Sequence, residues 1–281
     1  NILEDALALS LPETSLLWHS RSRHESLIAF SNKTYYANKL YTYPSPKERI
    51  SKVTYEYVSS VYGRGGSRAN RVEAEKVVAE ILARAEKKDA MESIGVVTFS
   101  TAQKNMIEDL LGEAFRDKPE LEEKFMTPEE PLFVKNLENV QGDERDVILF
   151  SIGYGPDENG KISLNFGPLN RENGWKRLNV AITRAKKEMK IFTSIQPEQM
   201  DITRTSARGV ENLKEFLEYA RRGRSLLTLD ALKRQEKDEA FLYSVKRALE
   251  EKGLQVDALV GSSKYRVDLG IINETDNSYK L

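Results

Sequence analysis

The sequence has no cysteine and only two histidines, His19 and His24. Without thiols the chain can form no disulfide, thiolate nucleophile or cysteine zinc site, and two histidines are too few for a histidine-rich metal site. No apolar run approaches the roughly 20 residues that a membrane helix needs. The first residues also lack the basic and then apolar layout of a signal peptide. These absences predict a soluble protein in a reducing, cytoplasmic setting, with no membrane partner.

Neither sign of charge dominates, because 43 basic residues meet 44 acidic residues and the net charge is −1. Any nucleic-acid surface must therefore be a local patch, since the global field does not attract phosphate. A length of 281 residues can hold one large domain or two ordinary ones. A start at Asn1 and an end at Leu281, within a strand-like run, indicate a piece of a longer protein.

Strand-like and helix-like stretches alternate over the first 200 residues. The continuous apolar run from Ile94 to Phe99 is typical of a strand buried on both faces. Asn70 to Glu73 has the form of a capping box that begins a helix. Tyr154 to Arg171 is rich in glycine, asparagine and proline, which predicts an exposed insertion. The repeated alternation favours an α/β fold with a parallel sheet covered by helices on both sides.

The pattern changes after residue 200. Gly209 to Arg221 has the pattern of an amphipathic helix, and Arg221 to Arg224 that of a linker. A second unit begins near Leu229, with a helix from Lys237 to Lys252 and strands from Leu254 to Val260 and from Tyr265 to Ile272. We therefore divide the chain into three parts: a first domain of residues 1–200, a helical linker of residues 201–228 and a partial second domain of residues 229–281.

Two segments carry most of the functional information: VQGDERDVILFS, which begins at Val140, and RLNVAITRAKKE, which begins at Arg177. In the first, an amide, a glycine and two carboxylates precede the apolar run Val147 to Phe150. This order predicts a polar loop that leads into a buried strand, with Gly142 allowing another backbone or a ligand to approach closely.

In the second segment, apolar residues recur at helical spacing and predict a core-facing stripe: Leu178, Ala181, Ile182 and Ala185. Arg177 and Arg184 are two turns apart on one face and border that stripe. Guanidinium groups held in this way can bind a phosphate with planar, bidentate geometry. Taken alone, each segment is also explained by an ordinary loop and strand, or by a solvated helix face.

Together and in this order, the two segments resemble motifs V and VI of superfamily 1 helicases, in the branch that reads QGxExD and RLNVAxTRAK. The resemblance covers most of residues 1–200 and implies the second RecA-like domain of such an enzyme. It implies that Gln141 and Gly142 lie at the nucleotide and domain interface and that Glu144 contacts the sugar or couples nucleotide to nucleic acid. Arg184 takes the place of the arginine finger, which stabilises charge on the transferred γ-phosphoryl group. Arg177 has a supporting role in this nucleotide site.

The segment LLWHSRSRHESLIAFSN resembles motif IV, in which the arginine of a YR-type pair faces the nucleotide. Ser20 and Arg21 take that place, so the aromatic partner is missing. The resemblance implies that Arg21 is a phosphate contact with a catalytic role. Arg23 is a competitor for this role, because the spacing can be read either way, although a surface arginine at a helix start explains it equally well.

Thr98 and Phe99, together with Gln103, resemble the GVxTxYxxQ segment of the family, which faces single-stranded nucleic acid. Ser100 can donate to a phosphate from a helix N-terminus, or it can simply cap the helix. Asn70 and Glu73 match the NxxEA pattern of the family, and helix capping is a sufficient explanation for both.

No GxxxxGK[ST] phosphate loop occurs, and no apolar strand ends in an Asp-Glu pair that could hold magnesium. In the family these parts belong to the first RecA-like domain, which would precede Asn1. The chain is therefore expected to bind ATP and Mg²⁺ fully only with that upstream domain, and not to hydrolyse ATP unaided.

The run LVGSSKYRVDLGI, from Leu259 to Ile271, resembles a strand of Vsr-like and related restriction-endonuclease folds. The resemblance implies a small α/β endonuclease-like fragment in which Asp268 binds a second Mg²⁺ that activates water. The other acidic ligands would lie past Leu281. The helix glutamate of the family is missing, although Glu239 can substitute for it. An ion-pair or turn residue is the alternative for Asp268.

The resulting hypothesis is the C-terminal motor-domain fragment of an ATP-dependent DNA helicase that acts on single-stranded or duplex DNA. Gln141, Glu144 and Arg184 favour it. One alternative is a non-catalytic nucleic-acid-binding module of helicase architecture, which the missing aromatic before Arg21 favours. The other is an RNA helicase of the same branch, but the endonuclease-like tail favours DNA.

Overall fold

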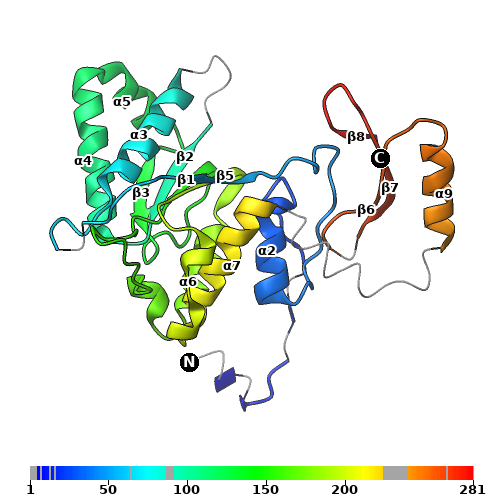
Figure 1. The fold of residues 1–281 in the computed structure, drawn as a ribbon, viewed down its shortest axis with the longest axis horizontal. Coiled ribbons are helices and arrows are strands. Elements are labelled where there is room, and N and C mark those ends of the chain that lie inside the picture. The colour runs from blue at the N-terminus through cyan, green and yellow to red at the C-terminus, as the bar shows by residue number, and fades with distance from the viewer. Residues whose placement is uncertain are drawn as a thin grey trace.

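Five parallel strands form the central sheet of the protein (Figure 1). The computed structural model describes residues 5–6, 8–12, 14–15, 17–63, 65–86, 92–223, 240–263 and 265–280. The strand order is β1-β5-β4-β2-β3, and every neighbouring pair is parallel. The strands are β1 (Val53–Tyr57), β2 (Ile94–Thr98), β3 (Phe133–Asn136), β4 (Arg145–Ser151) and β5 (Ala185–Thr193). The sheet confirms the predicted parallel α/β class.

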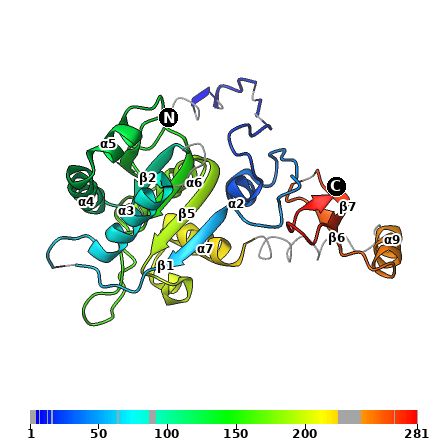
Figure 2. The same cartoon turned by 90° about the horizontal axis from the view of Figure 1, so that it is seen from above.

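Helices cover both faces of the sheet, because its inner strands are apolar on both sides. Along β4, Ile148 and Phe150 enter one buried cluster, whereas Val147 and Leu149 enter the other. This alternation is the two-residue period of a strand. The helices on the first face are α2 (Ser26–Tyr36), α6 (Gly174–Ile182) and α7 (Arg208–Arg222). Those on the second are α3 (Arg71–Ala85), α4 (Thr101–Asp117) and α5 (Pro119–Met126) (Figure 2).

The segment from Tyr154 to Arg171 is not the exposed insertion that its composition predicts. Leu164, Phe166 and Leu169 are buried in the same cluster as α6 and α7. The short 3₁₀ helix Gly167–Asn170 positions the last of these residues. The polar residues and glycines of this segment therefore form tight turns between three buried apolar side chains. The composition of the segment does not indicate that these three side chains are buried.

Helix α7 also packs as part of this unit, although the sequence analysis includes it in a linker. Val210, Leu213 and Leu217 are fully buried, and the Tyr219 hydroxyl donates to the Ser26 carbonyl at 2.8 Å. The helix therefore closes the face formed by α2 and α6. The division of the chain into three domains stays a prediction.

The C-terminal part is a helix, α9 (Ala240–Glu250), and a small antiparallel sheet of β6 (Val256–Val260), β7 (Val267–Ile272) and β8 (Tyr279–Lys280). It contacts the first unit through backbone donors. The Ser262 amide donates to the buried Glu25 carboxylate at 2.9 Å, and the Tyr279 amide donates to the Pro46 carbonyl at 2.7 Å. Across the described residues, none of the helices has the length and hydrophobicity to cross a membrane. The cytoplasmic location stays a prediction.

Candidate nucleotide site and strand-facing edge

Arg21, Glu144 and Arg184 meet at the edge of the sheet where β4 and β5 begin. The Arg21 Nε donates to Glu144 Oε2 at 2.6 Å, and its Nη1 donates to the Thr183 carbonyl at 3.2 Å. Arg184 Nε donates to the Val180 carbonyl at 2.7 Å. The structure therefore brings together two of the predicted arginines and one predicted carboxylate, although Arg21 and Glu144 are 123 residues apart in sequence.

The local structure around Arg184 differs from the expected helix. Helix α6 ends at Ile182, Thr183 is its C-cap, and Ala185 already pairs with Arg145 as the first residue of β5. Ala185 is therefore not part of the helical stripe, and Arg184 does not share a helix face with Arg177. The strand pairing of β5 with β4 overrides the helical periodicity. Arg184 consequently lies in the turn that joins the helix to the sheet.

Arg184 lies in an electrostatically unfavourable environment. Partial burial and then the nearby Arg21 lower the pKa of Arg184, against the opposing effect of Glu144. Arg184 Nη1 donates to the Asp143 carbonyl at 3.4 Å, and its Nη2 donates to the Thr183 hydroxyl at 3.2 Å. A phosphate at this edge would relieve the repulsion between the arginines.

His19 is a neighbour of these arginines that the sequence analysis did not assign to the site. Burial, together with the positive charges of Arg21 and Arg184, lowers its pKa to about 4. Its Nε2 accepts the Ser22 amide at 3.1 Å. A neutral imidazole thus fixes the turn that carries Arg21. Its position two residues before Arg21, in the segment that resembles motif IV, was the available signal.

The other predicted nucleotide residues lie around the same loop but are not all joined to the cluster. Gly142 has a φ of +94°, so the tight turn before β4 requires a residue that tolerates the left-handed region. Gln141 is exposed beside it. Arg177 lies 3.7 Å from Glu138 at its Nη2, in a surface pair that includes none of the three cluster residues.

The carboxyl edge of β2 carries the residues predicted to face nucleic acid. Thr98, Phe99 and Gln103 are each at most 1% exposed, so their side chains pack inside the domain. Ser100 is partly exposed, and its hydroxyl accepts the Gln103 amide at 3.1 Å as the N-cap of α4. Ser100 is thus the accessible member of the four, and the buried members shape the edge around it.

A buried polar network lies directly beneath this edge. Asn70 caps α3 by accepting the Glu73 amide at 3.1 Å, as predicted. The Glu73 carboxyl group does not return the bond, because it accepts from the Ser151 hydroxyl and the Gly153 amide, both at 2.7 Å. Gln103 joins the network by donating to Ser151 at 3.0 Å and accepting the Asn70 amide at 2.7 Å. The capping box is therefore only half formed.

Burial raises the pKa of Glu73 to about 8, although the hydrogen bonds from Ser151 and Gly153 oppose this shift. Its hydrogen-bond partners among the described residues, the Ser151 and Ser194 hydroxyls and the Gly153 amide, carry no positive charge. Glu73 is thus a neutral acid at pH 7 that ties the ends of β4 and β5 to the starts of α3 and α4.

Asp268 is exposed on β7. Within the ranges that the structure describes, no group of three or more His, Asp and Glu side chains could hold a metal ion. Glu239, the suggested substitute for the helix glutamate, lies outside the described residues. The metal assignment of Asp268 stays a prediction.

The described fold and site define an α/β domain with a parallel sheet and a phosphate-compatible pair of arginines at one edge. Residues 5–196 match the family model of an AAA domain. Since this match covers more than half of the chain, the protein belongs to that family of AAA domains.

Two curated relatives are proteins of mycoplasmas. The chain is 33% identical over 242 residues to the uncharacterized ATP-dependent helicase MG140 of Mycoplasma genitalium, covering 83% of the chain and 21% of that protein. It is 31% identical over 214 residues to the MG140 homolog of Mycoplasma pneumoniae, covering 73% and 18% respectively. The chain spans about a fifth of the length of these curated relatives.

Among solved structures, the C-terminal domain of a possible DNA helicase from Lactobacillus plantarum WCFS1 is similar, with a TM-score of 0.36 and 12% identity. The similarity covers 62% of this chain and 88% of that one.

Proposed function

We propose that the chain is the second RecA-like domain of an ATP-dependent DNA helicase of superfamily 1. In this proposal it supplies the arginine finger and contacts to nucleic acid, while an upstream RecA-like domain supplies the phosphate loop and the ligands of Mg²⁺. The relatives named as ATP-dependent helicases, with which the chain is about one-third identical, support this role. DNA is favoured over RNA by the endonuclease-like sequence of the tail.

The observation that carries the proposal is the cluster of Arg21, Glu144 and Arg184. Glu144 holds Arg21 through its Nε and the Thr183 carbonyl accepts from its Nη1, so Nη2 is the nitrogen that has no acceptor among the described residues and can donate to a phosphate. The Val180 carbonyl holds Arg184 through its Nε at 2.7 Å, while its Nη1 and Nη2 make longer contacts of 3.4 and 3.2 Å that a phosphate can replace. Two positioned guanidinium groups can stabilise the negative charge that develops on a transferred phosphoryl group.

The division of labour between the two domains predicts a specific activity pattern. The chain alone is expected to show negligible ATP hydrolysis, and fusion to its upstream domain is expected to restore it, because the cluster has no phosphate loop to hold ATP. Steady-state phosphate release with and without single-stranded DNA measures both states. Robust hydrolysis by the isolated chain would refute this division of labour, and an inactive two-domain protein that still binds DNA would support the non-catalytic alternative.

For the tail, we propose a role as part of a nuclease domain in which Asp268 binds Mg²⁺. Its exposure on β7 is compatible with a ligand. In the full-length protein, Asp268→Asn is expected to abolish Mg²⁺-dependent cleavage of plasmid DNA, because the amide is a weak ligand for a hard cation. Asp276→Asn, in the turn before β8, is the matched control and is expected to cut normally. Undiminished cleavage by Asp268→Asn would contradict the assignment.

A further inference from the structure

A cavity of about 520 Å³ opens between the start of β1 and the start of β5. Three cationic side chains that form no ion pair within the described residues line it: Arg23, Lys47 and Lys52. Lys187, Glu92 and Glu188 complete the charged part of the wall. The nucleotide site described above uses none of these residues.

Both carboxylates in the wall pair with Arg84, which also pairs with Glu80. Glu188 lies 2.5 Å from Arg84, and Glu92 lies 3.5 Å from the same guanidinium, which is only 8% exposed. Lys187 is held by Asp146 at 2.9 Å. By contrast, Arg23, Lys47 and Lys52 have no carboxylate within 4.0 Å among the residues that the structure describes. The cavity is therefore a local site of positive charge on a chain with a net charge of −1.

Hydrogen bonds fix the backbone at each of these three residues. The Arg23 amide donates to the Lys186 carbonyl at 2.8 Å. The Lys47 carbonyl lies 3.1 Å from His24 Nε2, and the Lys52 amide donates to the Ser26 hydroxyl at 2.9 Å. Because the backbone is fixed before any ligand arrives, an anion would not have to order these segments.

The position of the cavity connects two parts of the protein. Arg23 follows the nucleotide-facing Arg21 by two residues. On the opposite wall, the loop that carries Lys47 also accepts the Tyr279 amide of β8 at the Pro46 carbonyl, at 2.7 Å. The cavity thus lies where the RecA-like unit meets the C-terminal sheet.

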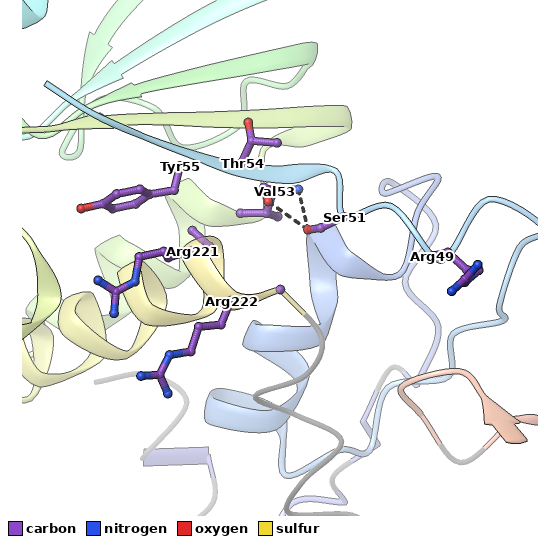
Figure 3. Close-up of a pocket in the computed structure, with 9 residues that line it drawn as sticks. Arg49, Ser51, Val53, Thr54, Tyr55, Arg221 and Arg222 are labelled. Carbon is purple, nitrogen blue, oxygen red and sulfur yellow. Dashed lines mark hydrogen bonds between the residues drawn. The ribbon is translucent and has the colours of Figure 1, made fainter. Parts of the chain in front are cut away.

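A second cavity, of about 550 Å³, lies on the other side of the β1 start and is also rich in arginine. Figure 3 shows Arg49 on one side of Ser51, with Arg221 and Arg222 on the other, so their guanidinium groups do not converge. Arg221 is also bound by Glu198 at 2.8 Å, and Arg49 lies 3.4 Å from Asp257. This second cavity therefore lacks the unpaired charge of the first.

We propose that the cavity of Arg23, Lys47 and Lys52 binds the phosphates of a DNA strand that passes between the RecA-like unit and the C-terminal sheet. This inference rests on the proposed handling of DNA but assigns a second contact, remote from Ser100. Lysine ammonium groups bind phosphate as point charges, which suits a grip on the backbone that is independent of base sequence.

The test compares the salt dependence of binding of a labelled single strand of about 20 nucleotides to the full chain, by fluorescence anisotropy. Lys47→Ala/Lys52→Ala removes two phosphate contacts. The negative slope of log K against log salt is therefore expected to become shallower by about 1.4, at about 0.7 per contact. By the same relation, affinity at about 0.1 M salt falls roughly 20-fold. The matched control, Lys76→Ala/Lys118→Ala, removes two exposed lysines from the α3 and α4 side and is expected to keep the slope.

An unchanged slope in Lys47→Ala/Lys52→Ala would overturn the proposal, provided that its melting temperature matches that of the wild type. A second arm adds pyrophosphate alone in a thermal-shift assay. Loss of pyrophosphate stabilisation in the double variant, with unchanged strand binding, would assign the cavity to a free phosphate ligand and also overturn it. If the two-domain protein hydrolyses no ATP while the slope still falls, the helicase proposal fails and the cavity assignment stands.

Discussion

Alanine in place of Arg184 is expected to lower ATP turnover by the two-domain protein by about 10³- to 10⁵-fold, the range for removal of an arginine finger. The affinity for ATP is expected to change little, because the phosphate loop and base contacts lie in the other domain. Arg184 is suited to this effect because the Val180 carbonyl orients its guanidinium group while burial leaves the positive charge poorly compensated. Single-turnover hydrolysis and equilibrium binding of a fluorescent nucleotide measure the two quantities separately.

Two further variants make this test specific. Arg184→Lys keeps the charge but loses the planar fork, so it is expected to recover only a small part of the rate. Arg71→Ala removes an exposed arginine that pairs with Glu75 on α3, and it is expected to hydrolyse ATP at the wild-type rate. If turnover of Arg184→Ala is within tenfold of the wild type, Arg184 is not the arginine finger, and Arg21 would then be the residue to test.

The central sheet could be predicted from the sequence because its strands carry local signals. The apolar run from Ile94 to Phe99 is buried on both faces, and Val147 to Phe150 alternate between two clusters as a strand period requires. The order of the strands depends on contacts between distant segments, for which the sequence provides no local signal. The same limit applies to α7, whose amphipathic pattern does not indicate which face of the sheet it covers.

In the candidate nucleotide site, the residue types could be predicted and their local geometry could not. The resemblance to helicase motifs brings Arg21, Glu144 and Arg184 to attention, and the structure joins them. However, helical spacing continues through Ala185, while pairing of β5 with β4 ends the helix at Ile182. Periodicity within one segment cannot report such competition from another strand.

Helix capping was a sufficient explanation of Glu73 from the sequence, but the structure gives its carboxyl group a different role. A capping box would leave its carboxyl group near the protein surface and ionised. Instead, Glu73 is fully buried and accepts hydrogen bonds from Ser151 and Gly153, while Gln103 takes the backbone amide that it was expected to cap. Gly153 has a φ of +70° and lies against the Gln103 side chain, so the chain turns tightly at this network. The network therefore depends on a carboxyl group that the fold holds in its neutral form.

The stability of the protein is consequently expected to fall as the pH rises from 6 to 9, and Glu73→Gln is expected to remove this fall. The pKa of Glu73 is about 8 in the folded protein and near 4.5 when the chain is unfolded, so the folded state holds an extra proton between these values. A group with a raised pKa contributes stability at low pH that is lost through this window and is constant above it. At about 1.4 kcal/mol per pH unit, the wild type should lose roughly 3 kcal/mol between pH 6 and pH 9 through this group.

Denaturant unfolding of the wild type and of Glu73→Gln at several pH values measures the difference directly. Other ionisable groups contribute equally to both proteins, so the gap between the two unfolding free energies isolates Glu73. Glu75→Gln, at an exposed position on the same helix, is the matched control and should parallel the wild type. Parallel curves for Glu73→Gln and the wild type would mean that Glu73 is ionised in the folded state, with a partner beyond Ser151 and Gly153. A difference in unfolding free energy that widens up to pH 8 and then stays constant would instead show that a buried neutral acid supports the carboxyl edge of β2.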